Sequence, residues 1–547
     1  MRKLQTSRDT SVCLEQNRRL SQSLIWRLQR RFFDQRGIDA WKQATVPQYI
    51  TSNPFIAGAY SRLVFGFLRD CYAVTGGNDS IPLDLNEPVY IVELGSGSGR
   101  LAYHFLKKFM SVSSRSTIKD IPFKYVMTDA IERNLGYWRA HPSLKPFVEQ
   151  GALDFALFDA EQSEDIRLCH SGDILSAGKI KNPLVVVANY LFDSIPQDVF
   201  YLQDGQLYES LITVSSPREE PDLEDPEILS RIEISYDNHP TSGEYYDDPD
   251  LNRILEYYQQ RLADTYVLFP FAALRCTRRL RNMSGGRMLL ISADKGYIKE
   301  DSLAGRDEPA INVHGSFSMM VNYHAIAQYF QNSGGQALHT SHRHSHINIC
   351  AFLLGRQPDT FTETRQAYSE AIEQGGPDDF YTLKKGIDKH YEDLSLEQLI
   401  ALLRLSGWDP KIFLDSFPAM LDRVESASEL VRQELYRGIR RVWDNYYHIG
   451  EERDIAFCMA MLLYGMDHYL DALTYFDHSL RLYGPDPSTL YNMAMCHYAL
   501  RQLDRANECV DQTLELDPAF DAAKIMLIKI QSEAAGQNSL DSSTISP

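Results

Sequence analysis

Short apolar runs alternate with amphipathic stretches through the middle of the chain. Buried strands are predicted at VYIVEL (89–94), FKYVMTD (123–129), LDFALFDA (153–160), LVVVANYLF (184–192), RMLLISAD (287–294) and HINICAFLLG (346–355). Helices are predicted near 100–109, 131–140 and 321–335. Strands that alternate with helices favour crossover connections, so we expect an α/β Rossmann-like domain with a mostly parallel, seven-stranded sheet.

Further elements flank or interrupt this alternation. The N-terminal part predicts helices at 24–33 and 57–73, separated by the loop VPQYITSNPF (46–55). A β-hairpin that turns at Asp204-Gly205 is predicted for 198–214, as an insertion. The stretch 219–250 is rich in carboxylates and almost free of bases, which is typical of a solvated loop. The alternative is that this stretch guides a basic substrate.

Beyond Gly355 the pattern predicts helices, and the last of them repeat. DALTYFDHSLRLYGPDP aligns with RANECVDQTLELDPAF at an offset of 34 residues, pairing Ala472 with Ala506 and Leu480 with Leu514. A helix-turn-helix period of this length is typical of tetratricopeptide repeats. We therefore expect an N-terminal helical segment (1–85), a Rossmann-like domain (86–355) with the hairpin and acidic insertion (198–250), a helical linker region (356–445), an all-α tetratricopeptide-like domain (446–535) and a disordered tail (536–547).

Composition and charge argue against several functions. A content of 44% hydrophobic and 24% charged residues is ordinary for a soluble protein. The net charge of −19 argues against nucleic-acid binding, which needs a basic face. The eight cysteines are scattered without a C-x-x-C pair, and neither a secretory signal nor an apolar run of the ~18 residues that span a membrane is found. We expect a cytoplasmic protein that binds no nucleic acid and no membrane.

The most specific motif is Glu93-Leu94-Gly95-Ser96-Gly97-Ser98-Gly99, where a buried strand meets a helix. Glycines let the backbone turn sharply, and the N–H groups of the helix N-terminus can bind a ligand. The third glycine comes one residue too early for the dinucleotide-binding G-x-G-x-x-G pattern. The E-x-G-x-G-x-G form instead resembles motif I of Rossmann-like, S-adenosylmethionine-dependent methyltransferases. The resemblance implies that Glu93, Gly95, Ser96, Gly97 and Gly99 bind S-adenosylmethionine.

Two aspartates end the next two predicted strands. Asp129, followed by Ala130, stands where a carboxylate can accept the ribose hydroxyls, as in dinucleotide sites. Asp159, followed by Ala160, stands where a carboxylate can accept the adenine amino group. Each aspartate could instead cap a helix, a position that aspartate favours.

The fourth strand is followed by Asn189-Tyr190-Leu191-Phe192-Asp193-Ser194-Ile195-Pro196. NYLFDSIP resembles the N-E-F-F-D-A-L-P loop of MidA-like methyltransferases, a family that includes a mitochondrial protein arginine methyltransferase needed for complex I assembly. The segment 49–68 resembles the F-x-T-S-P-E region of that family, and 286–297 resembles its G-x-x-L-x-I-D-Y-G strand. The resemblance implies the fold, the cofactor and methyl transfer. Tyr190 replaces the loop's glutamate and Ser292-Ala293 replaces the Asp-Tyr pair, so arginine as the acceptor is not implied.

Candidate catalytic residues lie in the same loop, because ligands bind beyond the carboxyl ends of the strands. Asn189 could orient the acceptor and also contact the cofactor, and Asp193 or Tyr190 could take or relay a proton. The alternative is that Asp193 caps a following helix while Tyr190 only packs. His339, His342, His344 and His346 are interpreted as a solvated turn, and no metal is expected.

Three functions remain open at this stage. The first is methyl transfer to a protein or peptide that the helical repeats recruit. The second is an O- or N-methyltransferase of small molecules. The third is a cofactor-binding scaffold or assembly factor without catalysis. The intact glycine motif favours the first two, and the repeats slightly favour a protein or peptide substrate.

Overall fold

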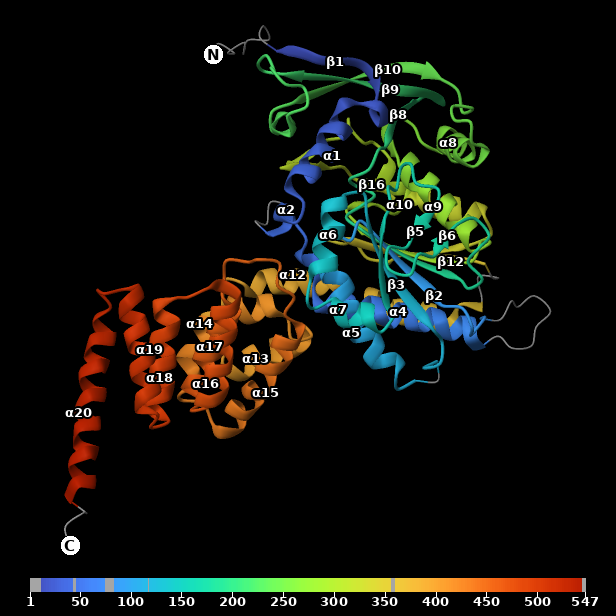
Figure 1. Ribbon diagram of the computed structural model, residues 1–547. Helices are drawn as coiled ribbons and strands as arrows, with labels where there is room; N and C mark the ends of the chain where they lie inside the picture. Colours follow the sequence, from blue (N-terminus) through green and yellow to red (C-terminus); the bar gives the residue numbers. More distant parts are fainter. Residues whose placement is uncertain (1–10, 43–45, 74–82, 117, 356–359, 544–547) are drawn as a thin grey trace. The chain divides into compact units, whose positions relative to one another are not determined.

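The computed structural model describes residues 11–42, 46–73, 83–116, 118–355 and 360–543 (Figure 1). The chain forms two compact units, Met1–Leu383 and Lys384–Pro547. The first unit contains the two large β-sheets, and the described part of the second unit is helical. No helix in the described ranges is long and apolar enough to cross a membrane.

The central sheet has seven strands in the order β17-β18-β12-β7-β2-β3-β4. Four neighbouring pairs, from β12 to β4, are parallel, whereas β18 is antiparallel to both β12 and β17, so the sheet is mixed. The strand order reverses between β2 and β7, and ligands bind at such switch points in open α/β sheets. The strands are β2 (Val89–Leu94), β3 (Phe123–Asp129), β4 (Leu153–Leu157), β7 (Leu184–Asn189), β12 (Met288–Asp294), β17 (Gln336–Leu338) and β18 (Asn348–Leu354).

Helices cover both faces of this sheet. Val92, Val186 and Leu290 pack with residues of α8, α9 and α10 in one buried cluster. Across the sheet, Phe105 of α5 lies 5.2 Å from Tyr125 of β3 between ring centroids, and α5 packs on α4. The helices are α4 (Pro54–Ala73), α5 (Arg100–Ser113), α6 (Glu132–Ala140), α7 (Lys145–Glu149), α8 (Pro249–Arg261), α9 (Phe271–Met283) and α10 (Tyr323–Asn332).

A second, antiparallel sheet is formed largely by segments for which no strand was predicted (Figure 1). The predicted hairpin forms β8 and β9, and its turn residues Asp204 and Gly205 both have positive φ, 49° and 75°. The hairpin belongs to this sheet and not to the central one. β10 comes from the acidic stretch, and β1 from the segment expected to be helical. The strands are β1 (Val12–Arg19), β8 (Asp198–Gln203), β9 (Gln206–Ser216), β10 (Glu233–Thr241) and β11 (Thr265–Phe269).

The N-terminal helix packs on this second sheet. Ile25 and Leu28 of α1 are buried with Val199 and Ile212, while Trp26 lies 4.9 Å from Phe317 between ring centroids. The remaining elements of the first unit are α1 (Leu24–Arg36), α2 (Asp39–Lys42), α3 (Tyr49–Ser52), β5 (Ile166–Arg167), β6 (Ile174–Leu175), β13 (Gly296–Tyr297), β14 (Asn312–His314), β15 (Ser316–Ser318) and β16 (Val321–Asn322).

The second unit contains successive helix pairs. Ala472 of α17 and Ala506 of α19, which the repeat aligned, are both fully buried. The assignment as tetratricopeptide repeats stays a prediction. The helices are α13 (Leu396–Leu405), α14 (Pro410–Val424), α15 (Glu429–Asn445), α16 (Ile455–Gly465), α17 (Tyr469–Tyr483), α18 (Pro487–Ala499), α19 (Leu503–Leu516) and α20 (Asp521–Ser543). The helix α20 continues into the segment expected to be disordered, of which residues 544–547 lie outside the described ranges.

Residues 360–383 are joined to α4 and to the segment before β18 by specific hydrogen bonds. Asp70 of α4 accepts hydrogen bonds from Glu363 N (3.1 Å) and Thr364 N (2.8 Å) at the start of α11 (Thr362–Tyr368). Asp378 in α12 (Pro377–Ile387) accepts from three consecutive backbone N–H groups at 345–347, just before β18. Phe55 stacks on Phe380 with ring centroids 4.4 Å apart.

A fragment ending at residue 355 should therefore be less stable than one ending at residue 390, which keeps α12 whole. Losing these bonds and the aromatic stack should lower the melting temperature by about 5 °C or more. Thermal melts of fragments 1–355 and 1–390, with the full chain as the reference, test this. Equal melting temperatures for the two fragments would show that 360–387 adds nothing to the first unit.

Candidate functional site

The glycine motif forms a tight turn at the switch point of the central sheet. β2 is buried along its whole length and ends at Leu94. Gly95, Gly97 and Gly99 have φ of +63°, +51° and +80°, a backbone region that side chains disfavour. The helix α5 begins directly afterwards at Arg100, so its free N–H groups face this turn.

The side chains of Leu191 and Trp41 pack closely against the glycine turn. A Cβ atom at Gly95 would lie 3.2 Å from the Leu191 side chain, and one at Gly97 would lie 2.9 Å from the ring of Trp41. Trp41 stacks on Phe33 of α1, with ring centroids 5.8 Å apart. The N-terminal helices therefore lie directly over the glycine turn.

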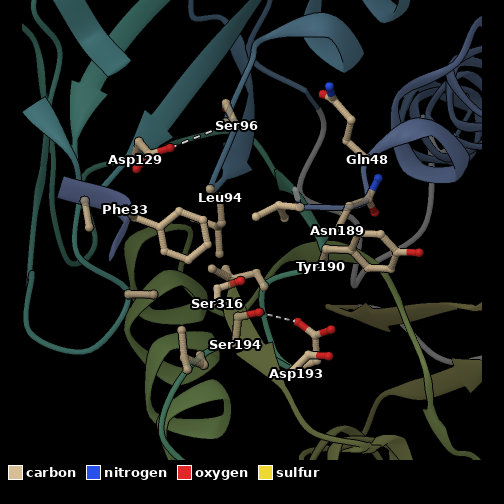
Figure 2. A pocket seen from close by; sticks show the side chains of 18 of the residues that line it. Phe33, Gln48, Leu94, Ser96, Asp129, Asn189, Tyr190, Asp193, Ser194 and Ser316 are labelled. Carbon is tan, nitrogen blue, oxygen red and sulfur yellow. Dashed lines mark hydrogen bonds between the residues drawn. The ribbon is translucent and has the colours of Figure 1, made fainter. Parts of the chain in front are cut away.

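A cavity of about 350 Å³ opens between this turn, the carboxyl ends of β3, β4 and β7, and the N-terminal helices. The volume lies within the range of roughly 300–1,000 Å³ that small-molecule sites usually have. In Figure 2, Asp129 and Ser96 lie toward one end of the pocket, and Asp193 and Ser194 toward the other. Of the predicted site residues, the cavity is lined by Glu93, Gly95, Ser96, Gly97, Asp129, Ala130, Asp159, Ala160, Asn189, Tyr190 and Asp193. Gly99 shapes the turn without lining the cavity.

Asp129 is buried and already holds three hydrogen bonds. Its Oδ1 accepts from Ile131 N (3.0 Å), and its Oδ2 accepts from Gly97 N (3.2 Å) and Asn134 Nδ2 (3.1 Å). A carboxylate offers about four acceptor positions. One ligand hydroxyl can therefore be added directly, whereas two would displace one of these bonds.

Asp159 pairs with a cation that the sequence did not single out. Arg30 of α1 donates through Nη1 to Asp159 Oδ2 (2.8 Å) and through Nη2 to Glu161 Oε1 (3.1 Å). Burial lowers the pKa of Arg30, but these carboxylates outweigh it, so the net pKa is raised. Asp159 Oδ1 accepts from Glu161 N (2.9 Å), which leaves acceptor positions toward the cavity.

Glu93 contributes a buried acceptor without a partner. Its side chain is 4% exposed, and Oε2 has no hydrogen-bond partner in the described structure. Burial raises the pKa of Glu93 to about 8. A buried polar atom without a partner is costly, so this oxygen suits a ligand that brings an N–H or cationic group.

The loop after β7 is held by neighbouring segments. Asn189 Oδ1 accepts from Tyr60 OH (2.7 Å), and Asn189 Nδ2 donates to Thr51 O (3.2 Å). Tyr190 has a φ of +49°, unusual for a side chain of this size, and its N–H donates to Ala293 O (3.0 Å). Burial raises the pKa of Tyr190, so its phenol stays neutral.

Asp193 lines the cavity with its side chain largely buried. Its Oδ1 accepts from Ser194 Oγ (2.6 Å), the bond drawn dashed in Figure 2. Burial raises the pKa of Asp193 to about 6. No helix follows, because the chain turns and enters β8 at Asp198. The structure therefore excludes the alternative that Asp193 caps a helix.

Part of the chain matches a protein family. Residues 82–348 match the model of a family described as "Putative S-adenosyl-L-methionine-dependent methyltransferase". This region is an S-adenosylmethionine-dependent methyltransferase domain. No curated protein matches the chain.

Solved structures from Burkholderia thailandensis also resemble the methyltransferase chain at low identity. One is an uncharacterized protein with 12% identity and a TM-score of 0.37, and the match covers 62% of this chain and 89% of that one. Another is a protein bound to S-adenosyl-homocysteine with 13% identity and a TM-score of 0.35, where the match covers 57% and 80%.

The residues around the cavity fit S-adenosylmethionine. The unpartnered Oε2 of Glu93 suits the ammonium group of the methionine part, and the N–H groups at the start of α5 suit its carboxylate. Asp129 has room for one ribose hydroxyl, and Asp159 for the adenine amino group. The cofactor and the class of enzyme predicted from the glycine motif are thus confirmed.

The methyltransferase site also contains residues that the sequence interpretation missed. Trp26, Gln29, Arg30 and Phe33 all line the cavity from α1. Their spacing of i, i+3, i+4 and i+7 defines one helix face, a visible signal, but such a face more often packs in a core. Gln48 also contributes, since its Oε1 accepts from Ser98 Oγ (2.8 Å) in the glycine turn.

The strand β12 ends in a carboxylate that the sequence interpretation did not single out. It ends at Asp294, which is followed by Lys295 and Gly296. Ser292 is a core residue, fully buried and 2.9 Å from Tyr323 OH. Asp294 is thus a carboxylate at the end of β12, two residues beyond Ser292.

The acidic stretch 219–250 and the histidines at 339–346 both form ion pairs with other segments. Glu224 of the acidic stretch binds Arg27 (2.9 Å) and Arg31 (2.7 Å) of α1, so this stretch fastens the helix that covers the cavity. Among the histidines, His344 Nδ1 lies 3.3 Å from Asp378 Oδ2. In the described ranges, no three His, Cys, Asp or Glu side chains gather as a metal site.

Proposed function

We propose that this enzyme methylates a protein or peptide that its helical second unit recruits. The observation that carries the proposal is the single cavity that joins the cofactor residues to the loop Asn189–Ser194. Cofactor and acceptor would then meet in one cavity, and holding two reactants in place supplies much of the rate. S-adenosylmethionine, when bound, supplies a methyl group on a positively charged sulfur.

The protein's own residues divide the work of the reaction. Asn189, fixed at both ends of its amide, orients the acceptor atom. Asp193 is the proton acceptor. Tyr190 lines the same cavity with a phenol that stays neutral. The helices α1 to α3 exclude water from the cavity.

The MidA-like resemblance supports the role of Asn189. Two of the segments that carry the resemblance, 49–68 and the loop after β7, are joined by a hydrogen bond of this residue. Thr51 belongs to the segment 49–68, and its carbonyl oxygen accepts from Asn189 of the NYLFDSIP loop (3.2 Å). A protein or peptide substrate is supported by the 34-residue repeat and by its buried alanines at 472 and 506. Glu224 of the acidic stretch is paired with two arginines of α1, and guidance of a basic substrate by the rest of that stretch stays a hypothesis.

Incubating the purified chain with a cell extract and methyl-labelled S-adenosylmethionine tests the proposal. We expect label in protein, above an extract without added enzyme. Label that enters small molecules alone would favour the O- or N-methyltransferase of small molecules. Cofactor binding without any transfer would favour the scaffold.

Removing the second unit should separate recruitment from chemistry. Fragment 1–390 is expected to bind the cofactor as the full chain does, but to label protein about tenfold less or worse, because the local concentration of substrate is lost. Initial rates of label incorporation at equal enzyme concentration measure the difference. Equal rates for the fragment and the full chain would contradict recruitment by the helical unit.

A further inference from the structure

Two buried carboxyl groups meet at the acceptor side of the cavity. Asp294 is the last residue of β12, and Asp193 follows β7, the parallel neighbour in which Asn189 lies opposite Ala293. The bond from Tyr190 N to Ala293 O pins the loop to the end of β12. As a result Asp294, fully buried, lies behind Asp193, which is 7% exposed and lines the cavity.

The hydrogen bonds around the two carboxyl groups leave one carboxyl oxygen without a donor. Asp294 Oδ2 accepts from Phe192 N (3.2 Å), whereas Asp294 Oδ1 has no ordinary donor in the described structure. Asp193 Oδ1 accepts from Ser194 Oγ (2.6 Å). Because Phe192 directly precedes Asp193, its bond to Asp294 places the two carboxyl groups beside each other, and each acts on the pKa of the other. Two carboxylates cannot both be ionised at such range, so a bond between them requires one to keep its proton.

The neighbouring ionisable groups place this proton on Asp294. Burial raises the pKa values of the surrounding phenols and thiol, so these groups stay neutral; they are Tyr60, Tyr190, Tyr323 and Cys350. Lys295 is the cation that acts on Asp193 and favours its ionised form. Burial, and then the charge of Asp193, raise the pKa of Asp294 well above its ordinary value.

We propose that Asp193 and Asp294 hold one proton between them, that ionised Asp193 accepts the proton of the methyl acceptor, and that Asp294 is the positioning residue that donates to Asp193. This inference rests on the proposed methyl transfer. As the lone pair of the acceptor forms the new bond to carbon, the electrons of the carbon–sulfur bond stay on sulfur. The N–H or O–H proton of the acceptor passes to Asp193.

The proposal restricts the acceptor to a chemical class. A proton acceptor is needed only where the acceptor must lose a proton, as a protonated amine or a hydroxyl does. A thioether loses none and would not use the pair. The acceptor is therefore a group that gives up a proton on methylation, such as a hydroxyl or an amine of a peptide side chain, and not a thioether.

Infrared spectroscopy of the full chain, with aspartate labelled by carbon-13 at its side-chain carboxyl, tests the shared proton directly. The label separates aspartates from Glu93, whose pKa is also raised. We expect the C=O band of an un-ionised aspartate near neutral pH, lost in Asp294→Asn. The control is Asp198→Asn, since Asp198 is equally buried but bonded to Tyr246 OH (2.6 Å) outside the cavity, and it should leave that band in place. An unchanged band in Asp294→Asn would overturn the shared proton.

The pH dependence of label transfer tests the role in catalysis. Wild-type turnover should fall as pH falls through about 6, where Asp193 gains a proton. Asp294→Ala removes the donor, so ionised Asp193 is less stable and the midpoint should rise by about one pH unit. Asp294→Asn still donates an N–H and should restore much of the shift. Asp193→Asn should lose about 10²-fold in turnover above pH 7, and its turnover should no longer fall as pH falls through about 6.

The outcomes separate this inference from the proposed function. Variants are compared only after calorimetry shows that they bind S-adenosylmethionine, which sets aside misfolding. A similar loss at every pH in both Asp294 variants would give Asp294 a structural role and overturn the inference, although methyl transfer would stand. If the wild type transfers no label, the methyl-transfer proposal fails, and the infrared band still decides whether the pair holds a proton.

Discussion

Replacing Gly97 with valine is expected to abolish binding of S-adenosylmethionine. The backbone φ of +51° there costs a side chain roughly 1–2 kcal/mol, and the new Cβ would lie 2.9 Å from the ring of Trp41. The branched side chain must push the turn or Trp41 away, which removes the bond from Gly97 N to Asp129 Oδ2. Isothermal calorimetry should detect no binding at concentrations that saturate the wild type.

A second glycine of the same domain provides the control for backbone strain. Gly151 has a φ of +72°, and a Cβ there would have nothing within 4 Å. Gly151→Val should therefore lose a comparable amount of stability and still bind the cofactor. Undiminished binding by Gly97→Val would instead remove the glycine turn from the cofactor site. Loss of binding in both variants would assign the effect to general destabilisation.

The central sheet was predictable because its strands carry their own signal. β2, β7 and β12 are runs of apolar residues buried on both faces, and each ends at a polar or glycine-rich turn. The second sheet lacks such a signal. Residues of β1 and β10 alternate between exposed and half-buried, so these strands exist because both pair with β9, far away in sequence.

The residues of the site also fall into those that local sequence patterns predict and those that only the tertiary fold brings together. Glu93, Asp129 and Asp159 lie at or just after the ends of strands that local patterns define, and all three line the cavity. Arg30 and Trp41 reach it only because the N-terminal segment folds back over the sheet, a tertiary arrangement that helical periodicity does not encode. Asp294 was visible in the sequence but was missed, because no local pattern shows that its side chain is buried at the end of β12 beside the loop that carries Asp193.

Replacing Asn189 with alanine should reduce turnover by about 10²-fold, or about 3 kcal/mol, while cofactor affinity changes by about threefold or less. The reason is that the amide orients the acceptor in the transition state, whereas Glu93, Asp129 and the glycine turn hold the cofactor. Initial rates of label transfer and calorimetry measure the two quantities separately. Near-normal turnover would move this role to Thr51 and Ser52, which line the same cavity.

The substitution also leaves the hydroxyl of Tyr60 buried without a partner, and a double variant separates this effect from catalysis. Tyr60 is fully buried and donates to Asn189 Oδ1 (2.7 Å), so Asn189→Ala alone should cost about 1–3 kcal/mol of stability. Adding Tyr60→Phe removes the unpaired hydroxyl and should restore much of that stability. Turnover should stay low, because phenylalanine cannot orient the acceptor. If turnover recovered together with stability, Asn189 would matter for packing and not for the reaction.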